Sequence, residues 1–148
     1  MELKREQPNA LNTVTRYGDQ FIEVNEIQYT HAIAFRPEGA IRPWNVTSVS
    51  DITTEQLILA ADMRKEAGNA IDFLDDNAPA CRYENAPEIL LVGTGARQHF
   101  LPVAVTAPLL AARVGIEAMD SKAAARTYNV LMAEGRNVAV ALMLTEGE

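Results

Sequence analysis

Residues 88–93 read Glu-Ile-Leu-Leu-Val-Gly, and this short apolar run decides the fold class. A continuous apolar run of this length is typical of a strand that is buried on both faces of a sheet. Two further strands are predicted at 114–119 and 138–144, and a helix is expected before each of them. Strands that alternate with helices form parallel sheets with right-handed crossovers, so this half predicts a β-α-β-α-β unit.

The sequence signals for the ends of the two helices in this unit differ in clarity. Asp120 or Ser121 can cap the start of the second helix, and Gly135 can end it. The first helix reaches about Arg113 but contains Pro108, and an interior proline costs about 3 kcal/mol or more. Thr106 can act as the N-cap instead, which would leave a short helix over roughly residues 107–113.

The N-terminal half predicts antiparallel strands. A short strand at 21–24 is followed by Asn25-Glu26 as a two-residue turn and by alternating residues from 27 to 35. Alternation with period two indicates a strand with one buried face, so we predict a hairpin. Residues 41–44 can add an edge piece, since Pro43 has no ladder donor.

One more helix precedes the apolar run. Thr53 and Gln56 have the spacing of a capping box, and the helix is predicted to continue to about Ala67, where Gly68-Asn69 can end it. The prediction is therefore a three-layer α/β fold. Its central mixed sheet contains the C-terminal parallel β-α-β-α-β unit and the N-terminal antiparallel hairpin.

Composition narrows the function classes. The 148 residues suit one domain, which we place at 15–146 after a flexible N-terminus at 1–14. Thirteen basic and twenty acidic residues give a net charge of −7, which disfavours nucleic-acid binding. No apolar run approaches ~18 residues, so no membrane insertion is expected. The start lacks a secretory signal and Cys81 is the single cysteine, so we expect a soluble cytoplasmic protein.

The loop after the apolar run is the candidate site. Its two glycines permit a tight turn and close backbone approach, and ligands of open α/β sheets favour the carboxyl ends of strands. Asp120 ends the next parallel strand at the same sheet edge, and the helix behind it carries a polar stripe. The candidate partner- or ligand-binding residues are Gly93, Thr94, Gly95, Arg97, Gln98, Asp120, Arg126 and Asn129.

Each of these residues also has a structural explanation. Arg126 can pair with Asp120, Asn129 can hold a loop, and the glycines can simply turn the chain. The loop lacks the third glycine of a dinucleotide fingerprint, and no catalytic or metal-ligand motif is present, so no cofactor, metal or catalytic residue is predicted.

Four C-terminal motifs together resemble one known family. They are residues 87–95 (Pro-Glu-Ile-Leu-Leu-Val-Gly-Thr-Gly), 115–120 (Gly-Ile-Glu-Ala-Met-Asp), 124–131 (Ala-Ala-Arg-Thr-Tyr-Asn-Val-Leu) and 134–136 (Glu-Gly-Arg). This is the small domain-of-unknown-function family that includes the mitochondrial respiratory complex I assembly factor 3, the adipogenesis-associated protein of animals, and many bacterial and archaeal proteins. The resemblance covers roughly residues 15–60 and 86–144.

The resemblance implies a three-layer α/β fold with no established enzymatic activity, and a scaffold role in its eukaryotic relative. It implies that the glycine loop and the helix segment from Arg126 to Asn129 form the functional surface. Residues 62–85 look like an insertion relative to the family, and Pro108 looks foreign to it. Because the start lacks the pattern of a transit peptide, a mitochondrial address is not expected.

Two functions follow as hypotheses. The first is a non-enzymatic binding or assembly protein with protein partners, such as components of a respiratory or membrane complex. The alternative is a protein or enzyme that binds a small anion or metabolite at the rim of the Gly93-Thr94-Gly95 loop.

Overall fold

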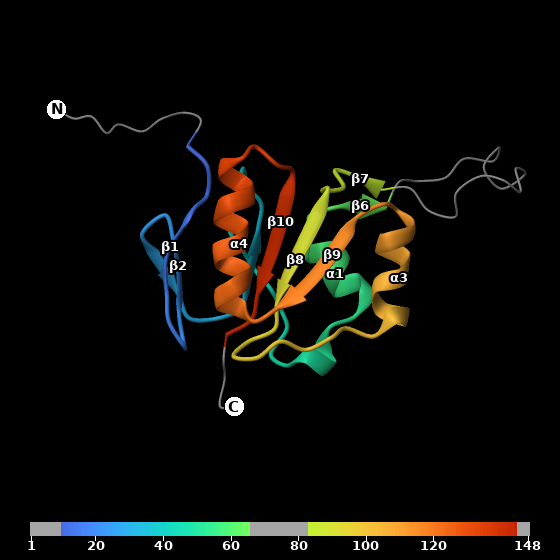
Figure 1. Ribbon diagram of the computed structural model, residues 1–148, viewed down its shortest axis with the longest axis horizontal. Coiled ribbons are helices and arrows are strands. Elements are labelled where there is room, and N and C mark those ends of the chain that lie inside the picture. The colour runs from blue at the N-terminus through green and yellow to red at the C-terminus, as the bar shows by residue number, and fades with distance from the viewer. Residues whose placement is uncertain (1–9, 66–82, 145–148) are drawn as a thin grey trace, which may run out of the picture.

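The computed structural model describes residues 10–65 and 83–144 in three layers (Figure 1). A five-stranded sheet lies in the middle, with helices on both of its faces. One face packs against α1 and α3, and the other against α4 and a separate three-stranded sheet. The elements are β1 (Val14–Tyr17), β2 (Ile22–Val24), β3 (Ile27–Tyr29), β4 (Ile33–Phe35), β5 (Arg42–Pro43), a 3-10 turn (Val49–Asp51), α1 (Thr54–Ala60), β6 (Arg64–Lys65), β7 (Tyr83–Glu84), β8 (Ile89–Gly93), α3 (Val103–Ala111), β9 (Gly115–Met119), α4 (Ser121–Ala133) and β10 (Val138–Leu142).

The parallel unit is present as predicted. β8 lies between β10 and β9, and both pairs are parallel. Leu91 at the centre of β8 pairs with Val140 on one side and with Glu117 on the other. Every residue of β10 is buried, as is β8 from Leu90 onward, which explains the continuous apolar runs.

The antiparallel part differs from the prediction in two respects. The prediction places no strand at Val14–Tyr17, where β1 pairs antiparallel with β2. The predicted strand 27–35 is two strands, because the chain leaves the hairpin at 30–32 and enters the central sheet as β4. The β2–β3 hairpin therefore belongs to its own sheet with β1, while β4 and β5 supply the antiparallel half of the central sheet. The residue pattern hides this break because the alternation continues through it without glycine or proline.

The predicted hairpin turn is confirmed. Asn25 and Glu26 have φ angles of 55° and 69°, as a two-residue turn of type I′ requires at both positions. The Asn25 side chain accepts from the Thr13 amide (3.0 Å) and donates to Asn12 Oδ1 (2.8 Å), which ties the turn to the start of β1.

α1 begins where predicted but ends earlier. Thr53 is the N-cap, and its hydroxyl accepts from the Gln56 amide (3.1 Å). The helix stops at Ala60 instead of Ala67 because Asp62 turns into the left-handed region (φ 57°). The Gly68-Asn69 end signal lies outside the described residues. So does most of the proposed 62–85 insertion, whose described ends pair as β6 and β7.

Two arginines cap the C-terminus of α1, and sequence reasoning missed both. Arg42 donates to the Leu59 carbonyl (2.6 Å) and the Ala60 carbonyl (3.1 Å), and Arg36 donates to the Ala61 carbonyl (3.0 Å). Partial burial lowers the pKa of each guanidinium from its ordinary value. These long-range contacts fix the end of α1, and no local sequence pattern predicts them.

The helix α3 also corrects an expectation. It begins at Val103 with Pro102 as the N-cap, so Thr106 is not the cap and Pro108 lies inside the helix. Pro108 removes the hydrogen bond to the Ala104 carbonyl, and both residues are exposed. Water can therefore donate a hydrogen bond to that carbonyl, which reduces the free-energy cost of the interior proline.

Candidate functional site

The glycines of the candidate loop are required by the fold. A Cβ atom on Gly93 would lie 2.8 Å from the Cα of Ser121, closer than real Cβ contacts allow. Gly95 has a φ of 93°, a conformation that L-residues rarely adopt. The loop after β8 can thus approach the start of α4 only with glycine at these two positions.

Thr94 is fully buried and shapes the same loop from inside. Its hydroxyl oxygen lies 2.6 Å from the Arg97 carbonyl oxygen and 3.2 Å from the Met119 carbonyl oxygen. The same oxygen accepts from the His99 amide (3.1 Å). Thr94 therefore holds the loop and offers no free group to a ligand.

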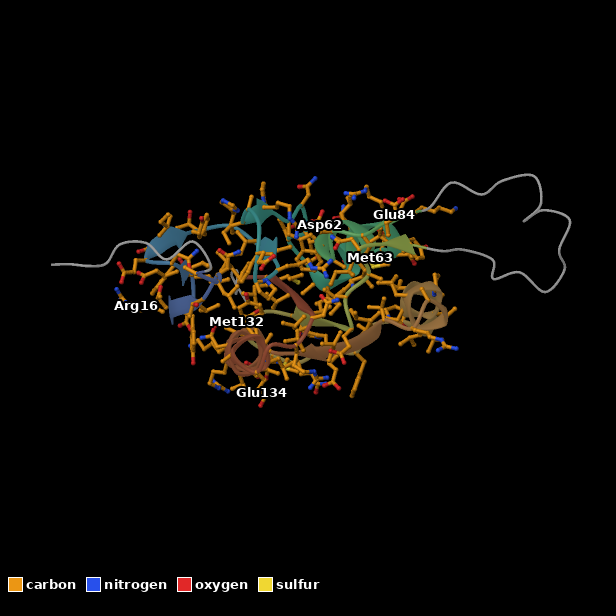
Figure 2. The ribbon with its side chains drawn as sticks, turned by 90° about the horizontal axis from the view of Figure 1, so that it is seen from above. Arg16, Asp62, Met63, Glu84, Met132 and Glu134 are labelled. Atoms are coloured by element: carbon orange, nitrogen blue, oxygen red, sulfur yellow. The ribbon has the colours of Figure 1, made fainter. Side chains whose placement is uncertain are left out.

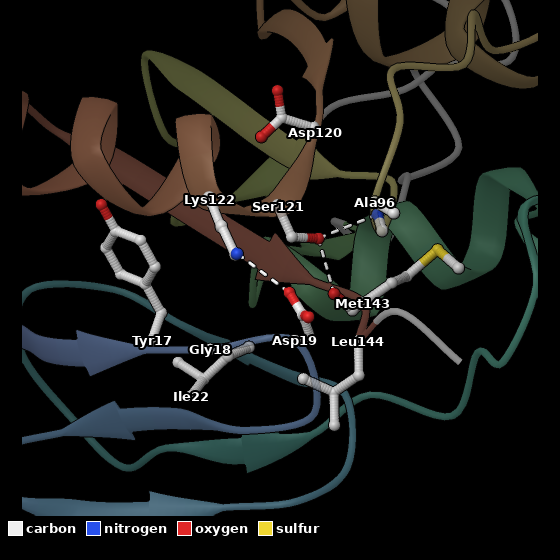
Figure 3. A pocket seen from close by; sticks show the side chains of 11 residues that line it. Tyr17, Gly18, Asp19, Ile22, Ala96, Asp120, Ser121, Lys122, Met143 and Leu144 are labelled. Carbon is white, nitrogen blue, oxygen red and sulfur yellow. Dashed lines mark hydrogen bonds and ion pairs between the residues drawn. The ribbon is translucent and has the colours of Figure 1, made fainter. Parts of the chain in front are cut away.

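Ser121 organises the site, although sequence reasoning considered it only as a helix cap. Its hydroxyl accepts from the Gly95 amide (2.9 Å) and donates to the Met143 carbonyl (2.5 Å), as the dashed lines in Figure 3 show. The Ser121 amide in turn donates to the Gly95 carbonyl (2.8 Å). The glycine loop, α4 and the end of β10 are joined at this one buried side chain.

A small cavity of about 100 Å³ opens beside Ser121 (Figure 3). It is lined by Tyr17, Gly18, Asp19, Ile22, Gly95, Ala96, Asp120, Ser121, Lys122, Met143 and Leu144. Lys122 forms an ion pair with Asp19 across it (2.9 Å). Asp120 is the N-cap of α4, where its carboxylate accepts from the Ala123 amide (2.8 Å).

Arg126 and Asn129 lie further along α4, where they contact β1. Asn129 accepts from the Val14 amide (3.0 Å) and donates to the Val14 carbonyl (2.9 Å), so both ends of its side-chain amide bind one strand residue. Arg126 donates to the Tyr17 hydroxyl (3.3 Å), and this hydrogen bond raises the pKa of Arg126 above its ordinary value.

Arg97 and Gln98 lie on the opposite side of the loop, near the outer strand β9. Gln98 donates through Nε2 to the Ala118 carbonyl (3.1 Å). The exposed Arg97 side chain has no hydrogen bond or ion pair within residues 10–65 and 83–144. The eight candidate residues thus separate into three places: the cavity beside Ser121, the contact with β1, and the outer edge of the sheet.

An exposed apolar surface lies at that outer edge, and sequence reasoning missed it. Phe100, Val103 and Leu110 are 84%, 78% and 51% exposed, and we call these three side chains the α3 face. The signal is present in the sequence, because residues 101–112 contain no charged residue. A groove of about 280 Å³ adjoins this face and is lined by Gln98, Phe100, Leu101, Thr106, Leu110, Ile116, Glu117 and Ala118.

Figure 2 shows where α4 and α3 lie relative to the central sheet. Viewed from above, α4 with Met132 and Glu134 lies on one side of the sheet, and the segment of Asp62 and Met63 on the other. α3 lies at the end of the molecule, beyond β9, where it packs against α1 and β9. None of the described helices is both long and apolar enough to cross a bilayer.

A comparison with known families decides the affiliation of the chain. Residues 14–143 match the model of the family described as "Protein of unknown function (DUF498/DUF598)". The chain belongs to this family. The family resemblance inferred from the four C-terminal motifs is thereby confirmed.

A protein from Bordetella parapertussis, whose crystal structure is known, is 50% identical to this chain, with a TM-score of 0.75. The match covers 93% of this chain and 99% of that one. It supports the mixed α/β fold described above.

Two curated relatives carry functional names. The bovine protein named NADH dehydrogenase [ubiquinone] 1 alpha subcomplex assembly factor 3 is 28% identical over 98% of this chain and 67% of its own length. A Francisella tularensis protein named 13 kDa major membrane protein is 40% identical over 35% of this chain. That match spans 42% of the Francisella protein, less than half of its length.

Proposed function

We propose that this protein binds a protein partner in the manner of an assembly factor and does not catalyse a reaction. The observation that carries the proposal is the α3 face. Three large apolar side chains are exposed there on an acidic chain: Phe100 and Leu110 line one groove, and Val103 lies two helical turns before Leu110 on α3. A contiguous exposed apolar patch is a feature of interaction surfaces, whereas single exposed apolar residues are common everywhere.

The energetics favour a binding role. Burying a side chain of this size contributes about 1.5–3 kcal/mol, so the three together can anchor a partner. Phe100 is the largest of them, and aromatic residues are enriched at interface centres. Arg97, three residues before Phe100 on the glycine loop, is exposed and would supply a charged group for an acidic partner.

The similarity to the bovine assembly factor supports the same proposal. Its name connects that protein with the assembly of a respiratory complex, and by analogy we propose a partner from a respiratory or membrane complex. We further propose a cytoplasmic location, which cell fractionation can test.

The test is a tagged capture from the native cell, read by mass spectrometry. The variant Phe100→Ser with Val103→Ser should lose the partner while keeping the fold, because both side chains are exposed. The matched control is Val130→Ser, which removes a 56% exposed apolar side chain from α4. Equal capture by the wild type, the control and the double variant would contradict the proposal.

The cavity beside Ser121 favours a second candidate, the binding of a small anion or metabolite. Lys122 offers the one positive charge among the lining residues, although it is paired with Asp19 and Asp120 also lines the cavity, and Gly95 and Ala96 form part of the wall. A panel of carboxylates, phosphates and nucleotides tests this candidate by thermal shift. A ligand at 100 times its dissociation constant should stabilise the protein by about 2.7 kcal/mol, whereas a flat response would leave the cavity without a ligand role.

A further inference from the structure

The outer strand of the central sheet has an open backbone edge. β9 is the last strand beside β8, and no described strand lies beyond it. The Gly115 amide donates to the Glu88 carbonyl (3.0 Å), and the Met119 carbonyl accepts from the Thr94 amide (2.8 Å), so these two residues face β8. Backbone direction alternates along a strand, so Ile116 and Ala118 face outward.

The side chain of Gln98 confirms this direction. It donates to the Ala118 carbonyl from outside the sheet (3.1 Å). Gln98 is exposed, so it can leave this carbonyl to another donor. The remaining outward groups, the two amides and the Ile116 carbonyl, are positioned as one side of a strand ladder.

The groove beside this edge has the form that a strand needs. Ile116 and Ala118 project their side chains on the same face of the sheet as Leu90 and Val92, with which they pair. That face belongs to the core cluster that includes α3. An added strand would place every second side chain in the groove between β9 and the α3 face.

Charge at this edge differs from the rest of the molecule. Residues 89–116 contain no aspartate or glutamate, although the chain carries twenty of them. Arg113 lies just before β9 and is exposed, and Arg97 lies near its other end. A strand flanked by acidic residues would meet Arg113 at one end of β9 and Arg97, close to the helix cap Asp120, at the other. Glu117 points to the opposite face of the sheet from Ile116 and Ala118.

We propose that β9 accepts an extended segment of the protein partner as a sixth strand. The segment has alternating apolar residues for the groove and acidic residues at its ends. This inference rests on the proposed function and adds how the partner binds. The partner segment forms backbone hydrogen bonds with Ile116 and Ala118, and the α3 face forms the apolar wall of its groove. Strand addition of this kind obtains affinity from the main chain and specificity from alternate side chains.

The probe is a library of random linear peptides displayed on phage and selected against the full chain. The variant Ala118→Pro removes one outward amide but none of the bonds to β8, and proline is tolerated on edge strands. We expect selected peptides to show the alternating pattern with acidic ends. Their dissociation constant for Ala118→Pro should be about tenfold higher than for the wild type, because the loss of one backbone hydrogen bond weakens binding by about this factor. Val130→Ser is the control that keeps full binding.

A second measurement does not depend on the fold of a variant. Each selected peptide is synthesised in two forms, N-methylated at alternate amides. Only one form should bind the wild type, because half of the amides of a strand face β9. Hydrogen exchange of the Ile116 and Ala118 amides should slow in the complex.

Three results would overturn the strand addition: no enriched peptide, equal binding of both methylated forms, or unchanged exchange at Ile116 and Ala118. Capture of a native partner that depends on Phe100 but leaves these amides unprotected would also overturn it, while supporting the proposed function. Capture that is insensitive to Phe100 and Val103 would instead contradict the proposed function.

Discussion

The two crossover helices of the parallel unit have the same role in the topology but opposite surfaces. α4 buries five residues of its thirteen, and its N-terminus is capped by Asp120. α3 buries only Leu109 of its nine, has no side-chain cap, and contains Pro108. α4 presents Lys122 and other polar groups to water, whereas α3 presents valine and leucine.

This difference separates a helix that the fold needs from a helix that another molecule can use. The apolar residues of α4 stabilise the core, so its outer side is free to be polar. The exposed apolar residues of α3 stabilise little in the isolated chain. The proposed partner would bury them, and the following substitutions test the difference between the two helices.

The largest effect is expected at Tyr128. Its ring is fully buried, it packs edge-to-face on Phe35 with centroids 5.0 Å apart, and its hydroxyl donates to the Asn12 carbonyl (2.7 Å). Tyr128→Ala should lower the free energy of unfolding by about 3–5 kcal/mol in urea denaturation. Leu110→Ala on α3 should change it by about 0.5 kcal/mol or less. Similar losses of unfolding free energy in the two variants would contradict the proposed difference between α4 and α3.

Ser121 comes next. Ser121→Ala leaves the Gly95 amide and the Met143 carbonyl without their partner in a buried site. We expect a loss of about 1–3 kcal/mol by the same measurement. Ser50→Ala, at an exposed serine, is the control and should be nearly neutral. A neutral result at Ser121 would mean that the hydroxyl does not join the loop to α4.

A smaller effect is expected at the cap of α4. Asp120→Ala removes the acceptor of the Ala123 amide and should cost about 1 kcal/mol, because side-chain caps contribute on this order. Asp120→Asn preserves an acceptor and should retain most of the stability. If alanine and asparagine behave alike, the cap is not what stabilises this end of the helix.

The smallest effect concerns pH and the segment after α4. Arg136 donates to Glu88 (3.1 Å), and this hydrogen bond holds the pKa of Glu88 below its ordinary value of 4.5. The contribution is therefore complete above about pH 4.5 and is lost as the pH falls through the lower folded pKa. Arg136→Gln should be slightly less stable than the wild type at neutral pH. The difference should shrink as the pH falls below about 4.5, and a difference that grows on acidification would contradict this assignment.

Local signals in the sequence predicted much of the fold. The buried run of β8 predicted a parallel unit, Thr53 and Asp120 predicted helix starts, and Asn25-Glu26 predicted a turn. The break between β3 and β4 has no residue signal, since the alternation continues through it. The end of α1 depends on Arg36, just after β4, and on Arg42 of β5, and a local sequence pattern cannot reveal these contacts.

The candidate site was predictable in part. The glycines and Asp120 have local signatures, and the structure brings Gly95 and Asp120 together at one cavity. The bonds of Ser121 and of Asn129 depend on segments more than twenty residues away, so their structural roles emerge only in the folded chain. The α3 face was readable from the uncharged run 101–112, but such a run is equally typical of a buried helix.

The most direct test of the α3 face is photo-crosslinking in the native cell. A photoreactive phenylalanine analogue is placed at position 100 in one variant and at position 130 in another, both exposed apolar sites. The account predicts a discrete protein adduct from position 100 and none from position 130. No adduct at position 100, or equal adducts at both positions, would contradict the claim that the α3 face binds the partner.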